Sequence, residues 1–232
     1  TEDSENEANI LFRKTLLRKA ASNPKEVWNV LLSWLFTQQK EYAKALTQEK
    51  ALFQRKPENL DAILTIGKIA FEDSSFNASM QCFNFIIENS NAKNELINAH
   101  LYLIKIAIAT KNPETKSLFE RVFKQYGKNT ASLEIQVAYA TFLTFSENKP
   151  EEAIVVLTEA LSYANSKFDK ASIQLKLGDV LVFTGKFNKA LIYFSKIQTQ
   201  LKNHELGQEA RFKVAQTSYF KGDFDWAKAQ LK

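Results

Sequence analysis

Motifs for nucleotide, metal or acyl-transfer chemistry do not occur in this sequence. It contains no H-E-x-x-H, C-x-x-C, G-x-S-x-G or G-x-G-x-x-G pattern. The nearest approach to a phosphate-binding loop runs from Gly178 to Gly185, Lys186 and Phe187, with six residues between the glycines instead of four. Phenylalanine also stands where such a loop needs a hydroxyl group for its metal ion. We therefore expect these glycines to serve the fold rather than a nucleotide.

The remaining reactive residue types fit structural roles. His100 is expected in a helix and His204 in a loop, and neither has a second ligand at metal-binding spacing. Cys82 is expected to be a small core residue rather than a nucleophile. The acidic pairs Glu72-Asp73 and Glu151-Glu152 fall at expected helix or turn ends, where acidic residues favour the helix dipole. We predict that the protein is not an enzyme and binds no metal ion or cofactor.

Composition favours long helices and gives little support for a nucleic-acid or membrane partner. The 232 residues include only six glycines and four prolines, too few for the many tight turns of an all-β fold. The net charge of +5 comes from 31 basic and 26 acidic residues that are interspersed along the chain, as on solvated helix faces. Nucleic-acid binding is therefore only a weak alternative. No stretch approaches 18 consecutive apolar residues, so no membrane span is expected.

An internal repeat organises the chain. Gly67 and Gly178 are each followed by an aromatic residue nine positions later, a small residue at twelve and a second aromatic at sixteen. The small residue recurs with steps of 34, 74, 37 and 37 at Ala45, Ser79, Ala153, Ala190 and Ala227. The step of 74 is two periods of 37, which predicts a degenerate repeat whose small position lies near Lys116 or Ser117.

Apolar residues at i, i+3, i+4 and i+7, as in Trp28, Leu31, Leu32 and Leu35, predict two helices in each repeat. The first helices are expected near 25–38, 59–72, 94–110, 131–146, 168–184 and 206–220. The second helices are expected near 42–55, 76–90, 114–126, 150–165, 187–203 and from 224 to the end. The Ile- and Val-rich runs 101–108 and 153–157 are predicted to be helical as well, because helix-favouring sequence continues on both sides of each.

The pattern resembles the tetratricopeptide repeat. Two repeats show it most fully, one through Ile66-Gly67, Ser79, Phe83 and Ile86, the other through Leu177-Gly178, Ala190, Phe194 and Ile197. Ala45 with Pro57 matches the end of a third repeat, and the segment 218–227 is similar to turn regions in bacterial cell-envelope proteins of this family. Ser33 and Thr141 replace the repeat glycine, and the repeat at 94–128 is expected to lack both its glycine and its small residue, so its stacking is expected to be irregular.

The resemblance implies an all-α fold, a right-handed α-solenoid superhelix of about six helix-turn-helix repeats. The repeats are expected near 25–57, 59–92, 94–128, 131–165, 168–204 and 206–232, within a single domain that spans 1–232. A helix at 7–22 has the spacing of a second helix from a preceding unit. We expect the chain to be a fragment cut in mid-repeat at both ends, with terminal faces that favour self-association.

The family generally binds peptide segments in a concave groove lined by the first helices. Transferred to this sequence, the groove positions are Trp34, Lys68, Phe71, Lys105, Phe142, Phe145, Asp179, Phe183, Gln216 and Tyr219. A lysine and asparagine pair that clamps chaperone tails in some members has no match, because Leu64 precedes Lys68 and Leu175 precedes Asp179 in the corresponding turns.

We therefore predict a non-enzymatic scaffold for protein–protein interaction that binds a peptide or protein segment in this groove. The alternative is a structural oligomerisation or spacer module of a larger cell-envelope assembly. The resemblance suggests a bacterial periplasmic or cell-envelope location, and the cytoplasm is the other possibility left open.

Overall fold

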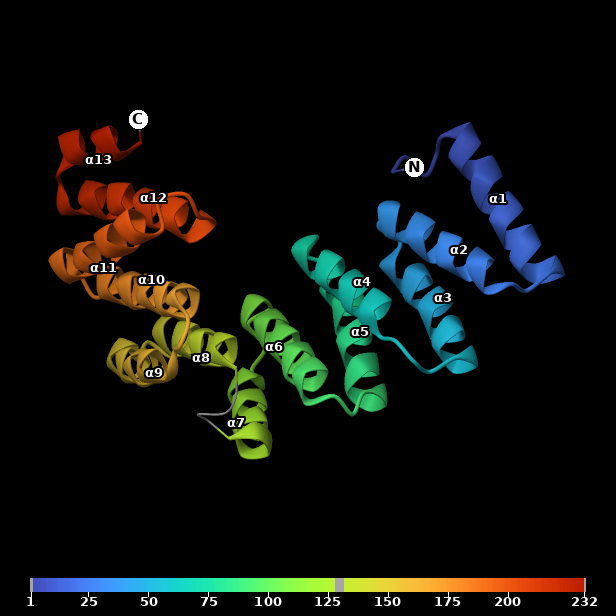
Figure 1. Cartoon of the computed structure of the whole chain (residues 1–232), viewed down its shortest axis with the longest axis horizontal. Coiled ribbons are helices and arrows are strands. Elements are labelled where there is room, and N and C mark those ends of the chain that lie inside the picture. Colours follow the sequence, from blue (N-terminus) through green and yellow to red (C-terminus); the bar gives the residue numbers. More distant parts are fainter. Residues whose placement is uncertain (1, 128–131, 232) are drawn as a thin grey trace. The chain divides into compact units, whose positions relative to one another are not determined.

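The computed structural model describes residues 2–127 and 132–231, and its regular structure in these ranges consists of helices (Figure 1). In chain order the helices are α1 (Glu7–Ser22), α2 (Glu26–Gln38), α3 (Tyr42–Arg55), α4 (Asp61–Glu72), α5 (Phe76–Asn89), α6 (Lys93–Ala109), α7 (Thr115–Tyr126), α8 (Leu133–Phe145), α9 (Pro150–Tyr163), α10 (Lys167–Phe183), α11 (Phe187–Gln200), α12 (Glu205–Lys221) and α13 (Phe224–Gln230). Each expected helix is confirmed, including the two Ile- and Val-rich runs, which lie inside α6 and α9. The repeat boundaries expected at 128 and 131 lie outside the described residues.

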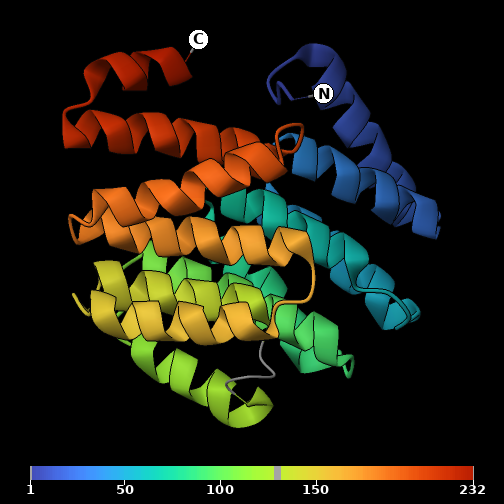
Figure 2. The same ribbon diagram turned by 60° about the vertical axis from the view of Figure 1, so that its left-hand side comes forward.

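The chain divides into two compact units, Thr1–Thr110 and Lys111–Lys232. Unit 1 contains α1 to α6, and unit 2 contains α7 to α13. In unit 1, α2 with α3 and α4 with α5 pack as antiparallel hairpins. In unit 2, α8 with α9, α10 with α11 and α12 with α13 are stacked one after another (Figure 2). The boundary falls between α6 and α7, inside the repeat expected at 94–128.

Close helix packing explains the glycines of the repeat. A Cβ atom at Gly67 would lie 3.0 Å from both the Cβ of Cys82 and the Cζ of Phe83, and a Cβ atom at Gly178 would overlap the ring of Phe194. The hydroxyl of Ser79, which is fully buried, donates a hydrogen bond of 2.8 Å to the carbonyl oxygen of Gly67. The five small residues whose spacing defined the period are all buried, so these hairpins close at the expected positions.

The first repeat replaces this glycine–aromatic contact with a polar one. Ser33 stands at the position of Gly67, and Glu49 stands at the position of Phe83, each 34 residues earlier. Ser33 is buried, and a hydrogen bond joins it to the carboxyl group of Glu49. Burial raises the pKa of Glu49, and the Ser33 hydrogen bond opposes that rise only in part.

The third repeat is one residue out of step with the expected phase. Thr115 is only 2% exposed, while Lys116 and Ser117 are both exposed, so the prediction of a small residue at 116 or 117 is wrong. Buried Phe119 and Val122 follow Thr115 by four and seven residues, as Phe83 and Ile86 follow Ser79. The third repeat therefore keeps a small residue, on a helix whose buried face begins one position earlier.

A left-handed residue ends the first helix of every repeat. Apart from Gly127, which follows α7, the positive φ angles occur at positions separated by 34 and then repeatedly by 37 residues, namely Lys40, Ser74, Lys111, Asn148, Gly185 and Gly222. In four of these turns the next backbone N–H reaches back to a carbonyl five residues earlier, as Ser75 does to Ala70 at 2.8 Å. This is a Schellman motif, which satisfies carbonyls at the end of a helix and turns the chain toward the second helix.

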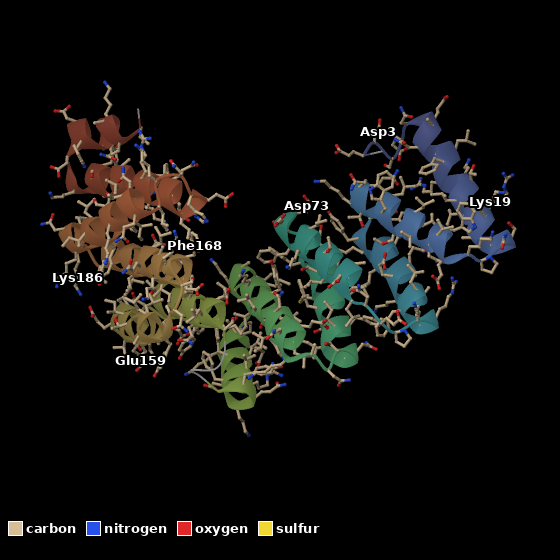
Figure 3. All side chains as sticks on the ribbon, viewed as in Figure 1. Asp3, Lys19, Asp73, Glu159, Phe168 and Lys186 are labelled. Carbon is tan, nitrogen blue, oxygen red and sulfur yellow. The ribbon has the colours of Figure 1, made fainter. Side chains whose placement is uncertain are left out.

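A polar contact links neighbouring repeats in unit 1. Asp73, at the end of α4 (Figure 3), accepts a hydrogen bond of 2.6 Å from the hydroxyl of Tyr42 and pairs with Lys40 Nζ at 2.8 Å. These two interactions lower the pKa of Asp73, and burial together with the Asp73 contact raises the pKa of Tyr42. The carboxylate therefore joins the turn of the first repeat to the turn of the second.

Candidate functional site

The first helices of the last three repeats, α8, α10 and α12, surround a pocket of about 340 Å³ in unit 2. Its lining residues are Phe145, Asp179, Val182, Phe183, Phe194, Lys213, Gln216 and Thr217. Four of the expected groove positions, Phe145, Asp179, Phe183 and Gln216, thus meet at one place although three different helices supply them. Helix α11 closes the pocket through Phe194, the aromatic residue that packs on Gly178.

Two aromatic rings give the pocket an exposed apolar edge. Phe145 is 53% exposed and Phe183 is 48% exposed, and their rings meet edge to face with centroids 5.3 Å apart. Each stands at the last turn of its helix, beyond the residues that face the core. Because the two rings hold each other in place and remain half exposed, they form a rigid apolar surface against which an apolar side chain of a ligand can pack and be removed from water.

A charged cluster forms the other side of the pocket. Asp179 pairs with Lys213 Nζ at 2.7 Å through one carboxylate oxygen and with Lys176 Nζ at 3.1 Å through the other. Lys213 also lies 3.8 Å from Glu209. The two lysines hold the carboxylate in place, so Asp179 presents a fixed polar edge beside the aromatic pair. Lys213 was not among the expected groove positions, although it precedes Gln216 by three residues and so lies on the same face of α12.

Phe142 and Tyr219 were expected at the groove, but neither of them lines this pocket. Phe142 is only 6% exposed, because Phe119 of α7 packs on it with ring centroids 5.5 Å apart. It therefore has no surface for a ligand and belongs to the core between α7 and α8. Tyr219 is 61% exposed but lies outside the pocket lining, against Phe224 of α13 at 5.3 Å.

Three of the expected positions in unit 1 gather around Tyr102, a residue that the sequence analysis did not select. The Nζ atoms of Lys105 and Lys68 lie 4.8 and 5.8 Å from the centroid of the Tyr102 ring. Phe71 meets the same ring edge to face at 5.5 Å. Burial, with a smaller effect of the Glu72 charge, raises the pKa of Tyr102. Trp34, on α2, is 45% exposed and is not part of this cluster.

The residues considered for chemistry have structural surroundings. Cys82 is fully buried, and burial raises the pKa of its thiol to about 12, so it is poorly suited to act as a nucleophile. His204 is the N-cap of α12, where its Nδ1 accepts a hydrogen bond of 3.2 Å from the Leu206 N–H, and its ring lies against Phe168. Among the described residues, no group of three or more His, Cys, Asp or Glu is arranged to hold a metal ion.

None of the described helices has the length and apolarity needed to cross a bilayer. No family model and no curated protein matches the sequence. A tetratricopeptide-repeat protein from Parabacteroides merdae matches with a TM-score of 0.61 at 13% identity, covering 98% of this chain and 86% of that one. A thermophilic protein of the same repeat class from Thermus thermophilus matches with a TM-score of 0.55 at 14% identity, covering 83% of this chain and 98% of that one. Hairpin packing, recurrent turns and these two likenesses agree that the chain has the tetratricopeptide-repeat fold, an all-helical solenoid.

Proposed function

We propose that the protein is a binding scaffold and that unit 2 holds a peptide segment of a partner protein against α8, α10 and α12. The observation that supports this most directly is the half-exposed pair Phe145 and Phe183 at the edge of a pocket that also presents the Asp179–Lys213 ion pair. Buried aromatic anchors supply most of the affinity at such sites, and surrounding charges mainly orient the partner.

The size of the pocket suits one large apolar side chain of the partner, with the backbone on either side lying along the helices. A pocket of about 340 Å³ is at the small end of the range for ligand sites. Lysine nitrogens carry three donors each, so Lys213 can donate to a partner carbonyl while it holds Asp179. The side chain that enters would cover Phe145 and Phe183 and remove both rings from water.

The test uses peptides selected by the wild-type chain from a random display library, because the natural partner is not yet identified. We expect Phe183→Ala and Phe145→Ala each to weaken binding of the selected peptides by about tenfold or more, since truncating an anchor costs at least ~1–2 kcal/mol. Phe212→Ala is the matched control, because Phe212 is 58% exposed on α12 and lies outside this pocket. Equal binding by wild type and Phe183→Ala would contradict the proposal.

The alternative, a structural module that self-associates, is favoured by the apolar surface of the last hairpin. Five large apolar residues there are more than half exposed, namely Tyr219, Phe220, Phe224, Trp226 and Leu231. Apolar patches of this kind mark interaction surfaces. Sedimentation analysis over a range of concentrations tests the alternative: association that Trp226→Asp abolishes would support it, and a monomer at every concentration would end it.

A further inference from the structure

The second helices of unit 2 form another groove, on the far side of α10 from the pocket described above. Its volume is about 530 Å³, and it lies between α9 and α11 with α10 as its floor. Leu177 and Leu181 of α10 face this groove, whereas Asp179 faces the other pocket. At ~100° per residue, Asp179 lies roughly 200° around the helix from Leu177, so the two sites are separate.

The floor and one wall of this outer groove are apolar. Leu177 and Leu181 are almost fully buried beneath it, and Ile154 of α9 and Tyr193 of α11 border it while partly exposed. Ile192 stands on the α11 wall and is 68% exposed. Because this apolar side chain is exposed to solvent, it can bury apolar surface against an apolar face of a ligand.

The charge of the groove is unbalanced. Its charged lining residues are Glu151 on α9, Lys186 at the N-cap of α11, and Lys189 and Lys196 on α11. Glu151 is already paired with Lys186 at 2.9 Å, at the start of α11 (Figure 3). Lys189 and Lys196 are both exposed, and within the described residues neither has an ion-pair partner. Seven residues apart, they share one face of α11 and stand about 10 Å apart along it.

The corresponding groove in unit 1 differs from the α9–α11 groove, because its lining cations both have ion-pair partners. The groove between α1 and α3 is lined by Arg13 and Lys44, and both pair with the single carboxylate of Glu41, Arg13 at 2.9 Å. Both cations of that groove are therefore held in ion pairs within the fold. Those of the α9–α11 groove, apart from Lys186, are available to a partner.

We infer that the α9–α11 groove binds an amphipathic helix of a partner protein that has acidic residues along one edge of its apolar stripe. A helix laid between α9 and α11 would place apolar residues at i, i+3 or i+4, and i+7 on Ile192 and the leucine floor. Two carboxylates seven residues apart on that helix match the spacing of Lys189 and Lys196. A nucleic acid fits less well, because Ile192 and the Lys186–Glu151 pair interrupt the line of cations.

The probe is a synthetic helical peptide of about 18 residues with leucines at i, i+3, i+7 and i+10 and glutamates seven residues apart beside them. Binding is reported by an environment-sensitive fluorophore on Thr158→Cys, an exposed position on the α9 wall. The sequence has one natural cysteine, Cys82, which is fully buried with a pKa of about 12, so labelling is confined to the new thiol. We expect a saturable signal that high salt weakens.

Charge reversal then locates the peptide. The Lys189→Glu/Lys196→Glu double variant is expected to weaken binding by about tenfold or more, since two favourable pairs become repulsive. A peptide with lysines in place of its glutamates should bind more tightly to this double variant than to the wild-type protein. The matched control is Lys170→Glu/Lys202→Glu, which changes the net charge equally at two exposed lysines outside this groove and should leave binding unchanged.

Several outcomes would overturn the inference. The first two are absence of binding and an equal loss of binding in both double variants. The third is displacement of the peptide by a 20-nucleotide DNA. The fourth is a dimer of the protein that Lys189→Glu/Lys196→Glu dissociates, because such a dimer would assign the groove to a second copy of the chain. Phe183→Ala separates this site from the proposed peptide pocket, because it should leave binding of the acidic helix intact. A signal lost in Phe183→Ala would place the probe in the other pocket and would equally overturn the inference.

Discussion

At Gly178 the packing leaves no room for a side chain, because the Phe194 ring occupies the space where a Cβ atom would lie. Phe194 is itself 1% exposed, so its ring has little freedom to move aside. Gly67 stands in the same position of its own repeat, but its nearest neighbours lie 3.0 Å from the site of a Cβ atom. The same sequence position therefore carries different steric demands in two repeats.

Gly178→Ala is expected to destabilise the protein by about 1–2 kcal/mol. Overpacking costs ~1–3 kcal/mol, and the better helix propensity of alanine returns up to ~1 kcal/mol. Gly67→Ala should change the free energy of unfolding by less, because smaller shifts relieve its contacts. Urea unfolding of the two variants and the wild type measures the difference. A larger loss in Gly67→Ala than in Gly178→Ala would show that the packing has been misjudged.

The raised pKa of Glu49 predicts how the stability of the protein depends on pH. Burial raises its pKa above the ordinary value of 4.5, so the folded state binds this proton more readily than the unfolded state does. The contribution of Glu49 to stability therefore improves as the pH falls through its raised pKa, and ionisation above that pKa costs stability. We expect Glu49→Gln to be more stable than the wild type at pH 7, by no more than ~1 kcal/mol because the group is partly solvated.

The advantage of Glu49→Gln should shrink when unfolding is measured near pH 5 instead of pH 7. Glu88→Gln is the control for removing one negative charge, since Glu88 is exposed on α5. A wild-type protein that is more stable than Glu49→Gln at pH 7 would mean that the Ser33 hydrogen bond outweighs the cost of burial.

Among the secondary-structure elements, the turns between paired helices are the most regular feature of the chain. Four of the six left-handed positions are not glycine, namely Lys40, Ser74, Lys111 and Asn148. A left-handed conformation costs an ordinary L-residue roughly 1–2 kcal/mol, and asparagine tolerates it better than lysine. At Lys40 and Ser74 the left-handed conformation belongs to a Schellman turn, which fixes how the second helix folds back on the first.

Lys111→Gly is expected to stabilise the protein by about 0.5–1 kcal/mol, because glycine removes the steric cost and gives back only part of it as backbone entropy in the unfolded chain. Lys111 is exposed with a φ angle of 52°. Asn148→Gly should give a smaller gain. Thermal unfolding of both variants provides the measurement, and a fall in stability for Lys111→Gly would contradict this account of the turn.

Helix positions could be predicted from the sequence because the apolar stripe and the turn residues recur with a period of 34 to 37 residues. Which face of α7 is buried could not be predicted in this way. Thr115 rather than Lys116 faces the core, and the small-residue pattern gave no sign of this because threonine was not among the small residues that define it. Contacts with neighbouring helices set which face of a short helix is buried, and the period alone leaves an uncertainty of one residue.

For the whole molecule, the division between Thr110 and Lys111 predicts which helices are destabilised when a core residue is truncated. The core of unit 1 includes Phe83, and one core of unit 2 includes Phe194; both rings are almost fully buried. In stacked repeats each unit depends mainly on its immediate neighbours. Damage in one compact unit should therefore stay largely within it.

Phe83→Ala is expected to cost about 3–5 kcal/mol and to reduce amide hydrogen-exchange protection in α4 to α6, because it leaves a cavity in a dense core. Protection in α10 to α12 should remain close to that of the wild type. Phe194→Ala should give the reverse pattern. Hydrogen exchange followed by mass spectrometry resolves the helices separately, and equal loss of protection in both units would contradict their independence.

Local physics was enough to place the helices, their turns and the buried small residues of every repeat but the third, because helical periodicity and packing of small against aromatic residues are encoded within 34 to 37 neighbouring positions. The resemblance to the tetratricopeptide repeat, and not periodicity alone, selected Phe145, Asp179, Phe183 and Gln216, which meet in one pocket. Residues that come together across repeats were not visible in this way. The burial of Phe142 under Phe119, the pairing of Lys213 with Asp179 and the uncompensated lysines of the α9–α11 groove depend on how separate helices pack. Such contacts follow from the angle and offset between helices, and no periodic pattern within one repeat specifies those quantities.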